Sequence, residues 1–78
     1  MRLFRLIRVL RYRDGTYSER GPVARVRAKH ARQARRILAD ELPAPKGLPS
    51  PWLHSRLSRC TPVPHARCAG MRAGLVTR

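Results

Sequence analysis

Acidic residues are scarce in this sequence, and the scarcity limits what the chain can fold into. Among 78 residues, 18 are Lys or Arg and only 4 are Asp or Glu, so the formal net charge is +14. A charge this large and of one sign opposes a compact state unless an anion neutralises it, and so short a chain builds only one modest core. The sequence therefore predicts one small domain whose first candidate partners are nucleic acid and anionic lipid.

Residues that could carry catalysis are equally scarce. The carboxylates are limited to Asp14, Glu19, Asp40 and Glu41. No phosphate-binding glycine loop, zinc-protease motif or nucleophile elbow is present. No stretch approaches the roughly 20 apolar residues that a membrane-spanning helix requires. We therefore expect a protein that is not an enzyme and needs no cofactor.

The first segment, Met1 to Arg13, reads MRLFRLIRVLRYR and fits two secondary structures. As a strand it places Phe4, Leu6, Leu10 and Tyr12 on one face, interrupted by Arg8, and the other face mixes Leu3, Ile7 and Val9 with arginines. As a helix it is basic and amphipathic, which suits an anionic membrane surface. Asp14-Gly15 follows directly and is a strong hairpin-turn signal, and a hairpin needs a strand on each side. We favour the strand, with the helix as the alternative.

The periodicity changes from strand to helix near His30. Val23 to Ala28 alternates apolar and basic residues, as a short strand does. From His30 to Glu41 the apolar residues recur at spacings of three and four among good helix formers, and Pro43 ends the pattern. No Ser, Thr, Asp or Asn near Lys29 supplies a usual N-cap. The sequence thus predicts a short strand followed by one helix without a capping residue.

The charges of this helix are placed against its dipole. Arg32, Arg35 and Arg36 lie in its first half, whereas its acids lie in the last turn. Such an order is expected where arginines hold phosphates, and also where they merely form a solvated face. Because Arg36 precedes Asp40 by four residues, this pair should interact.

The composition shifts at Pro43, because six of the seven prolines lie from that point on. Residues 43–50 are predicted to form an extended, proline-rich linker. Ser50-Pro51 is a good helix start, which predicts a short helix over residues 51–59 that docks on the core through Trp52. Residues 60–78 are predicted to be a flexible basic tail.

Two histidines and two cysteines after Pro43 could form a zinc site, namely His54, Cys60, His65 and Cys68. Their spacing differs from the usual paired arrangement, and a disulfide between the two cysteines would require an oxidising compartment. No secretory signal is apparent. We therefore expect free thiols, no metal and a cytoplasmic location.

Residues 11–42, RYRDGTYSERGPVARVRAKHARQARRILADEL, resemble the arm-type, AP2-like DNA-binding module of tyrosine recombinases from phages and mobile elements. The resemblance rests on Tyr12-Arg13-Asp14 at a strand end, Gly15 in the turn, the strand over residues 23–28, and Lys29-His30-Ala31 at the helix start. In that family the sheet enters the major groove and basic residues hold phosphates. The resemblance implies DNA binding and a phage or mobile-element origin.

Together these features predict an α+β fold in which a β-hairpin or small sheet packs on one helix (ββα, residues 1–42). The expected function is non-enzymatic nucleic-acid binding, with DNA favoured over RNA. The expected phosphate contacts are the arginines of the strands, turn and helix: Arg5, Arg8, Arg11, Arg13, Arg25, Arg27, Arg32, Arg35 and Arg36. Two alternatives remain, a phage-encoded inhibitor or adaptor that binds an acidic host protein and a membrane-surface amphipathic peptide. An exposed strand edge would also allow a homodimer.

Overall fold

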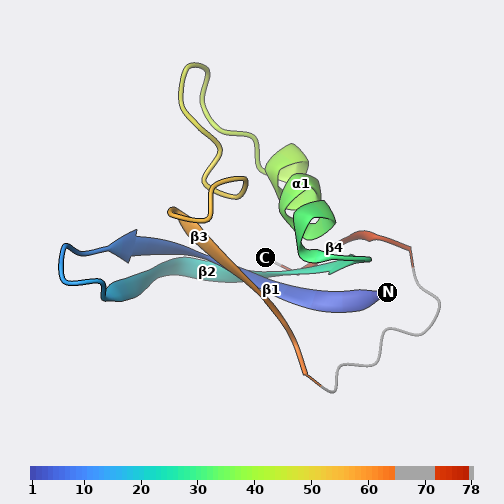
Figure 1. The fold of residues 1–78 in the computed structure, drawn as a ribbon. Helices are drawn as coiled ribbons and strands as arrows, with labels where there is room; N and C mark the ends of the chain where they lie inside the picture. The colour runs from blue at the N-terminus through green and yellow to red at the C-terminus, as the bar shows by residue number, and fades with distance from the viewer. Residues whose placement is uncertain (65–71, 78) are drawn as a thin grey trace.

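Four antiparallel strands and one helix make up the fold (Figure 1). They follow the order β1 (Arg2–Arg11), β2 (Tyr17–Ala28), α1 (Ala31–Glu41), β3 (Ser58–Pro62) and β4 (Gly74–Thr77). The computed structural model describes residues 1–64 and 72–77. The sheet order is β3-β1-β2-β4, so the two long strands form its centre and the later strands its edges. The predicted α+β class is confirmed, with a larger sheet than the predicted hairpin.

The first segment is a strand, which makes the amphipathic-helix interpretation of Met1 to Arg13 wrong. β1 leads into the predicted hairpin, in which the Tyr12 N–H donates to the Thr16 carbonyl at 2.9 Å and the Gly15 N–H donates to the Tyr12 carbonyl at 3.2 Å. Because Tyr12 pairs with Thr16, the loop has three residues (13–15), one more than a two-residue Asp14-Gly15 turn would have. Gly15 adopts the left-handed conformation in this loop, with a φ of 88°. The Asp14 carboxylate accepts the Thr16 hydroxyl and N–H, and these bonds hold the pKa of Asp14 below its ordinary value.

β2 continues through Gly21-Pro22, although these two residue types often interrupt a strand. The pairing with β1 passes from Leu6–Ala24 to Arg8–Arg20, so residues 21–23 of β2 oppose Ile7 alone. Gly21 adopts a φ of 78°, which glycine accepts without strain. Gly21-Pro22 therefore lies in a β-bulge, which bends the strand instead of ending it.

α1 lies across one face of the sheet, as Figure 1 shows, and closes a single apolar core. Ala34 and Leu38 are fully buried between the helix and the sheet, where they meet the buried side chains of Phe4, Leu6 and Val26. Trp52, only 7% exposed, completes this core, so the predicted docking of the tryptophan is confirmed.

A histidine caps α1, contrary to the expectation of an uncapped start. The Nδ1 atom of His30 accepts the Gln33 N–H at 3.1 Å, while the Gln33 side-chain oxygen accepts the Lys29 N–H at 2.7 Å. The arrangement resembles the capping box formed by Ser or Thr with Glu or Gln, except that the Gln33 side chain accepts the N–H of Lys29, which precedes the N-cap, and not that of His30 itself. The unprotonated imidazole nitrogen thus replaces the usual oxygen acceptor.

The predicted short helix over residues 51–59 is wrong. Residues 51–57 form turns, and β3 begins at Ser58 and pairs with β1 in the register Arg5–Thr61 and Ile7–Arg59. The open edge of β1 offers unpaired backbone groups, and pairing with them competes successfully with a local helix cap. β4 likewise adds to β2, so the segments predicted to be a short helix and a flexible tail supply the two edge strands. In the described residues no helix has the length and apolar character needed to cross a membrane.

The histidine cap provides a direct test of the helix start. We expect His30→Ala to lower the free energy of unfolding by about 1 kcal/mol, because the Gln33 N–H loses its acceptor. His30→Asn should retain wild-type stability, since asparagine is a good N-cap. Urea denaturation followed by circular dichroism measures both variants. Equal loss of stability in the two would show that the imidazole acts by packing instead of capping.

Candidate nucleic-acid interface

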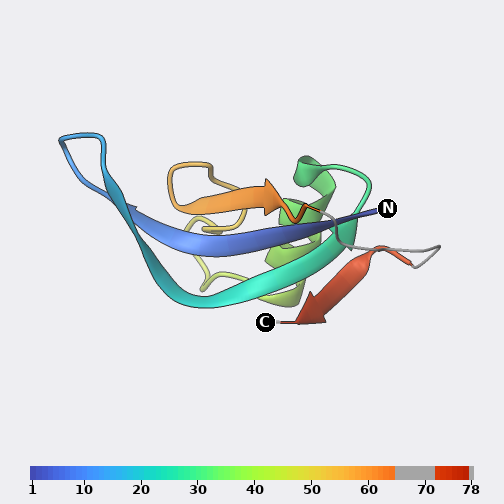
Figure 2. The ribbon, with the colours of Figure 1, turned by 90° about the horizontal axis from the view of Figure 1, so that it is seen from below.

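The face of the sheet opposite α1 carries most of the strand arginines. Strand alternation points Phe4, Leu6 and Val26 toward the helix and the residues between them the other way. Figure 2, seen from below, shows the strands in front of the helix, and no other described element lies over them. We call this surface the open face. Its arginines come from three strands and are Arg5, Arg11, Arg25, Arg27 and Arg59.

Like charges stand directly opposite one another on the open face. Arg5 pairs with Arg25 of β2 on one side and with Thr61 of β3 on the other. The one acidic side chain near them is Glu19, which accepts two hydrogen bonds from the Arg5 guanidinium at 3.0 and 3.3 Å. Like charges opposite each other across a strand pair oppose folding. The row therefore leaves positive charge that an external anion can neutralise.

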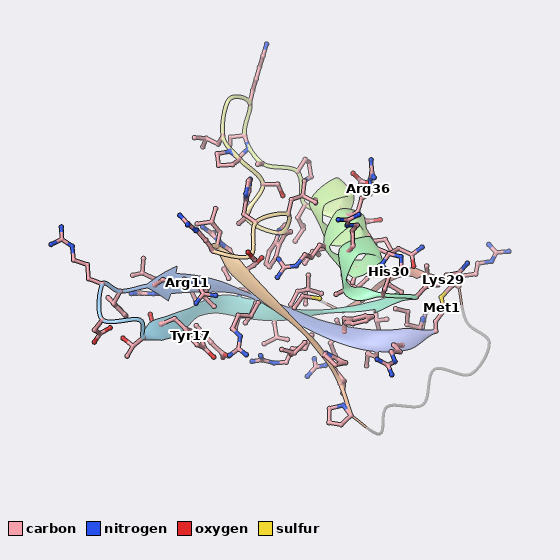
Figure 3. The ribbon with its side chains drawn as sticks, in the orientation of Figure 1. Met1, Arg11, Tyr17, Lys29, His30 and Arg36 are labelled. Atoms are coloured by element: carbon pink, nitrogen blue, oxygen red, sulfur yellow. The ribbon has the colours of Figure 1, made fainter. Side chains whose placement is uncertain are left out.

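Two further arginines are held in place by an aromatic ring. The guanidinium carbon of Arg59 lies 4.8 Å from the centre of the Tyr17 ring, and that of Arg11 lies 5.6 Å from it. Arg11 also donates to the Ser55 carbonyl at 3.2 Å. These contacts restrict side chains that otherwise lose much rotamer freedom on binding. Figure 3 shows Arg11 and Tyr17 together toward the hairpin end of the sheet.

The open face offers one aromatic ring only. Of the four aromatic residues in the sequence, Phe4 and Trp52 are buried in the core. Tyr12 lies at the hairpin end. A hydrogen bond with Ser18 and a weaker effect of Arg20 hold the pKa of Tyr12 below its ordinary value. Tyr17 is the remaining ring, and arginines lie over it. The face thus lacks the successive exposed rings on which single-stranded nucleic acids stack.

The nine predicted contact residues are divided among different surfaces. Arg5, Arg11, Arg25 and Arg27 lie on the open face, whereas Arg8 points to the helix side, opposite Arg20. Arg13 is exposed in the hairpin loop. Arg32 and Arg36 are exposed on α1, and Figure 3 shows Arg36 on the side of the helix away from the sheet. The structure thus brings together four of the nine.

Arg35 is half-buried, and its guanidinium is bound within the fold instead of being free for the predicted phosphate contact. Its guanidinium donates to the Trp52 carbonyl at 3.0 Å, to the Ser58 hydroxyl at 2.8 Å and to the Ser58 carbonyl at 3.2 Å. Ser58 is fully buried, and its hydroxyl donates to the Pro51 carbonyl at 2.6 Å. Arg35 therefore fastens the start of β3 and the preceding turns to the helix. The expected ion pair between Arg36 and Asp40 is not formed.

Arg59 and Tyr17 are members of the open face that the sequence prediction missed. Arg59 falls in the segment over residues 51–59, which the sequence predicts to be a helix, so the alternation of a strand is not expected there. Read as a strand, Ser58 and Cys60 point to the core side and Arg59 and Thr61 to the open face. The small–basic–small–polar order of these four residues is the signal that could have revealed the strand.

The predicted zinc ligands fall in different environments. His54 is exposed in a turn, whereas the half-buried Cys60 thiol donates to the Ala31 carbonyl at 3.9 Å. Burial raises the pKa of Cys60, an effect that the positive charge of Arg35 opposes. His65 and Cys68 lie outside the described residues. Within the described ranges, no three His, Cys, Asp or Glu side chains converge as a metal site would require.

Comparison with known proteins shows that no family model, curated protein or solved structure is significantly similar to this chain. The resemblance to the arm-type module therefore rests on the sequence motifs alone and stays a prediction.

The charge row on the open face predicts an unusual effect of mutation on stability. Arg25→Gln removes the repulsion with Arg5, and Arg25→Glu replaces it with an attraction. We expect stability to rise from wild type to the glutamine and then to the glutamate variant, by a few tenths to about 1 kcal/mol overall. Urea denaturation at low ionic strength measures the order. A falling order would show that Arg25 makes stabilising contacts in the free protein.

Proposed function

We propose that this protein is a non-enzymatic nucleic-acid-binding protein that binds duplex DNA through the open face. One observation carries the proposal: arginines from three neighbouring strands gather on the sheet face that no described element covers, with Glu19 as the single acid beside them. Phosphate contacts by arginine supply affinity in most protein–DNA complexes, and the bidentate guanidinium also reads guanine. The arginines of the open face can supply both the phosphate contacts and the guanine contacts.

The shape of the sheet suits a duplex. The major groove of B-DNA admits a two-stranded β-ribbon. Figure 1 shows the β1–β2 hairpin reaching past β3 at one end of the sheet, with α1 on the opposite side. The ribbon could therefore enter the groove while Arg13 at the loop and Arg59 on the edge strand contact the flanking phosphates. This mode is the one that the resemblance to the arm-type module implies.

The scarcity of exposed aromatic rings favours duplex DNA over single strands. Proteins that bind single-stranded DNA or RNA stack successive bases on aromatic side chains. Tyr17 is the one ring on the open face, and Arg11 and Arg59 lie over it. Groove and phosphate contacts are the recognition that this surface supports. The proposed setting is the cytoplasm of a host cell, with a phage or mobile element as origin.

The other functions expected from the sequence have unequal support. The membrane-surface alternative required an amphipathic helix over residues 1–13, and Arg2–Arg11 form a strand in which Phe4 and Leu6 lie in the core while Leu10 is exposed. Binding to an acidic protein surface uses the same arginines, so a nuclease-resistant complex with an acidic protein would favour it over DNA.

Salt dependence is the first test of the proposed function. If the five arginines of the open face contact phosphates, the logarithm of the binding constant should fall with the logarithm of salt concentration at a slope of about −4.5. A fourfold increase in salt would then weaken binding by a few hundredfold. Gel-shift titrations on duplex DNA, single-stranded DNA and RNA measure the slope and the preference. Binding that is insensitive to salt, or tightest on single strands, would contradict the proposal.

A matched pair of charge reversals tests the location of the interface. Arg25→Glu on the open face and Arg36→Glu on the outer side of α1 change the net charge equally. We expect Arg25→Glu to weaken duplex binding by about tenfold or more and Arg36→Glu by threefold at most, because only Arg25 lies at the interface. Arg25→Glu should also fold at least as stably as wild type, which separates lost binding from unfolding. Equal losses in the two variants would place the interface elsewhere or make it diffuse.

A further inference from the structure

A second surface lies on the helix side of the sheet, away from the open face. The loop between α1 and β3 rises beside the helix in Figure 1 and encloses a pocket of about 470 Å³ against β1. Its wall consists largely of proline rings, from Pro43, Pro45, Pro49 and Pro51, together with Trp52. We call this cavity the proline pocket. It is mainly apolar, as are most sites that bind a ligand or a peptide side chain.

The wall of the proline pocket is built from ordered turns. The Leu48 N–H donates to the Pro45 carbonyl at 3.0 Å across a turn in which Gly47 has a φ of 86°, and the Leu53 N–H donates to the Ser50 carbonyl at 3.3 Å. Arg35 holds the Trp52 carbonyl from below. Proline rings fix the backbone and carry no N–H donor. The pocket is therefore formed before binding, and its proline wall offers apolar surface more than backbone donors.

The exposed leucines around the pocket leave apolar surface without a partner. Leu48 is 63% exposed and Leu57 is 39% exposed, and both line the cavity. Arg8 is the one charged residue in the lining, and Arg20 stands directly opposite it on β2. No acid lines the pocket. An apolar hollow beside two unneutralised arginines matches a ligand that presents an apolar side chain with negative charge next to it.

We propose that the proline pocket binds a segment of a partner protein in which a large apolar residue is flanked by acidic side chains. The apolar residue would enter the hollow between Trp52 and Leu48, and the carboxylates would pair with Arg8 and Arg20. Such a segment buries the exposed leucines and neutralises the second like-charge pair of the sheet.

A second copy of this chain does not meet the same requirements. Each copy carries a net charge of +14, so two copies repel one another. Two of its four acids are engaged, because Asp14 accepts bonds from Thr16 and Glu19 pairs with Arg5. The occupant is therefore an acidic segment of another protein. Since the pocket and the open face lie on opposite sides of the sheet, such a partner and a duplex could bind at once, and binding at the pocket does not depend on DNA.

Peptide selection tests the proposal. A random dodecapeptide library would be selected on the wild-type protein with counter-selection on Leu48→Ser, which removes peptides held by charge alone. We expect enriched peptides that combine a Leu, Ile, Phe or Met with neighbouring Asp or Glu. Because Trp52 is the only tryptophan and lines the pocket, these peptides should also shift its fluorescence.

Matched variants locate the binding. Leu48→Ser and Arg8→Glu should each weaken the selected peptides by roughly tenfold. Leu53→Ser changes an exposed leucine of the same loop that does not line the pocket, and Arg36→Glu makes the same charge change outside it, so both should bind as wild type does. Enriched peptides without acids, an unchanged Trp52 spectrum, or equal loss in the controls would overturn the proposal. So would concentration-dependent self-association that Leu48→Ser abolishes, since the occupant would then be a second copy.

Discussion

The contact of α1 and Trp52 with one face of the sheet is the interaction on which the rest of the structure depends. It buries Phe4, Leu6, Val26 and Leu38 in one apolar cluster on the helix side of the sheet. The other side has no described element over it, and antiparallel strands tolerate polar and charged residues there. Ile7 and Val9 are nevertheless buried outside this cluster. The open face and its arginines therefore follow from this one-sided packing, and the charged surface is available to a partner without any movement of the fold.

The late part of the chain is joined to this core by a polar contact. Arg35 reaches from the helix to Ser58 and to the carbonyl of Trp52, and both partners are buried. The half-buried guanidinium is tolerated because three acceptors satisfy it. This contact sets where β3 starts, and β3 in turn adds Arg59 to the open face. One arginine of α1 thus contributes to both proposed surfaces by positioning them: it aligns the edge strand on one side and supports the wall of the proline pocket on the other.

The early half of the fold could be predicted from sequence because its signals are local. Asp14-Gly15 fixes a hairpin, and the change in periodicity near His30 marks the strand and the helix. β3 and β4 could not be predicted in this way, because they pair with strands that lie far away in the sequence, and Thr61 is the one β-branched residue of β3. Ser50-Pro51 is a sound helix start on local grounds, yet the open edge of β1 outweighs it. The hydrogen bonds of Arg35 could not be predicted for the same reason, since its partners Trp52 and Ser58 belong to the segment that was wrongly predicted to be a helix.

The two cross-strand pairs of like charge between β1 and β2 lie at the two proposed surfaces. Arg5 stands opposite Arg25 on the open face, and Arg8 stands opposite Arg20 on the helix side. Each pair costs stability in the free protein, and nothing in the packing of the core requires arginine at these four positions. Conflicts between local energetics and the fold are expected at functional sites, where a ligand supplies the missing interaction. For the first pair the proposed anion is the phosphate backbone of a duplex. For the second, beside an apolar pocket, it is the proposed carboxylate that arrives with an apolar side chain. The positions of the two like-charge pairs, more than the net charge, are therefore what favours these two surfaces as binding sites.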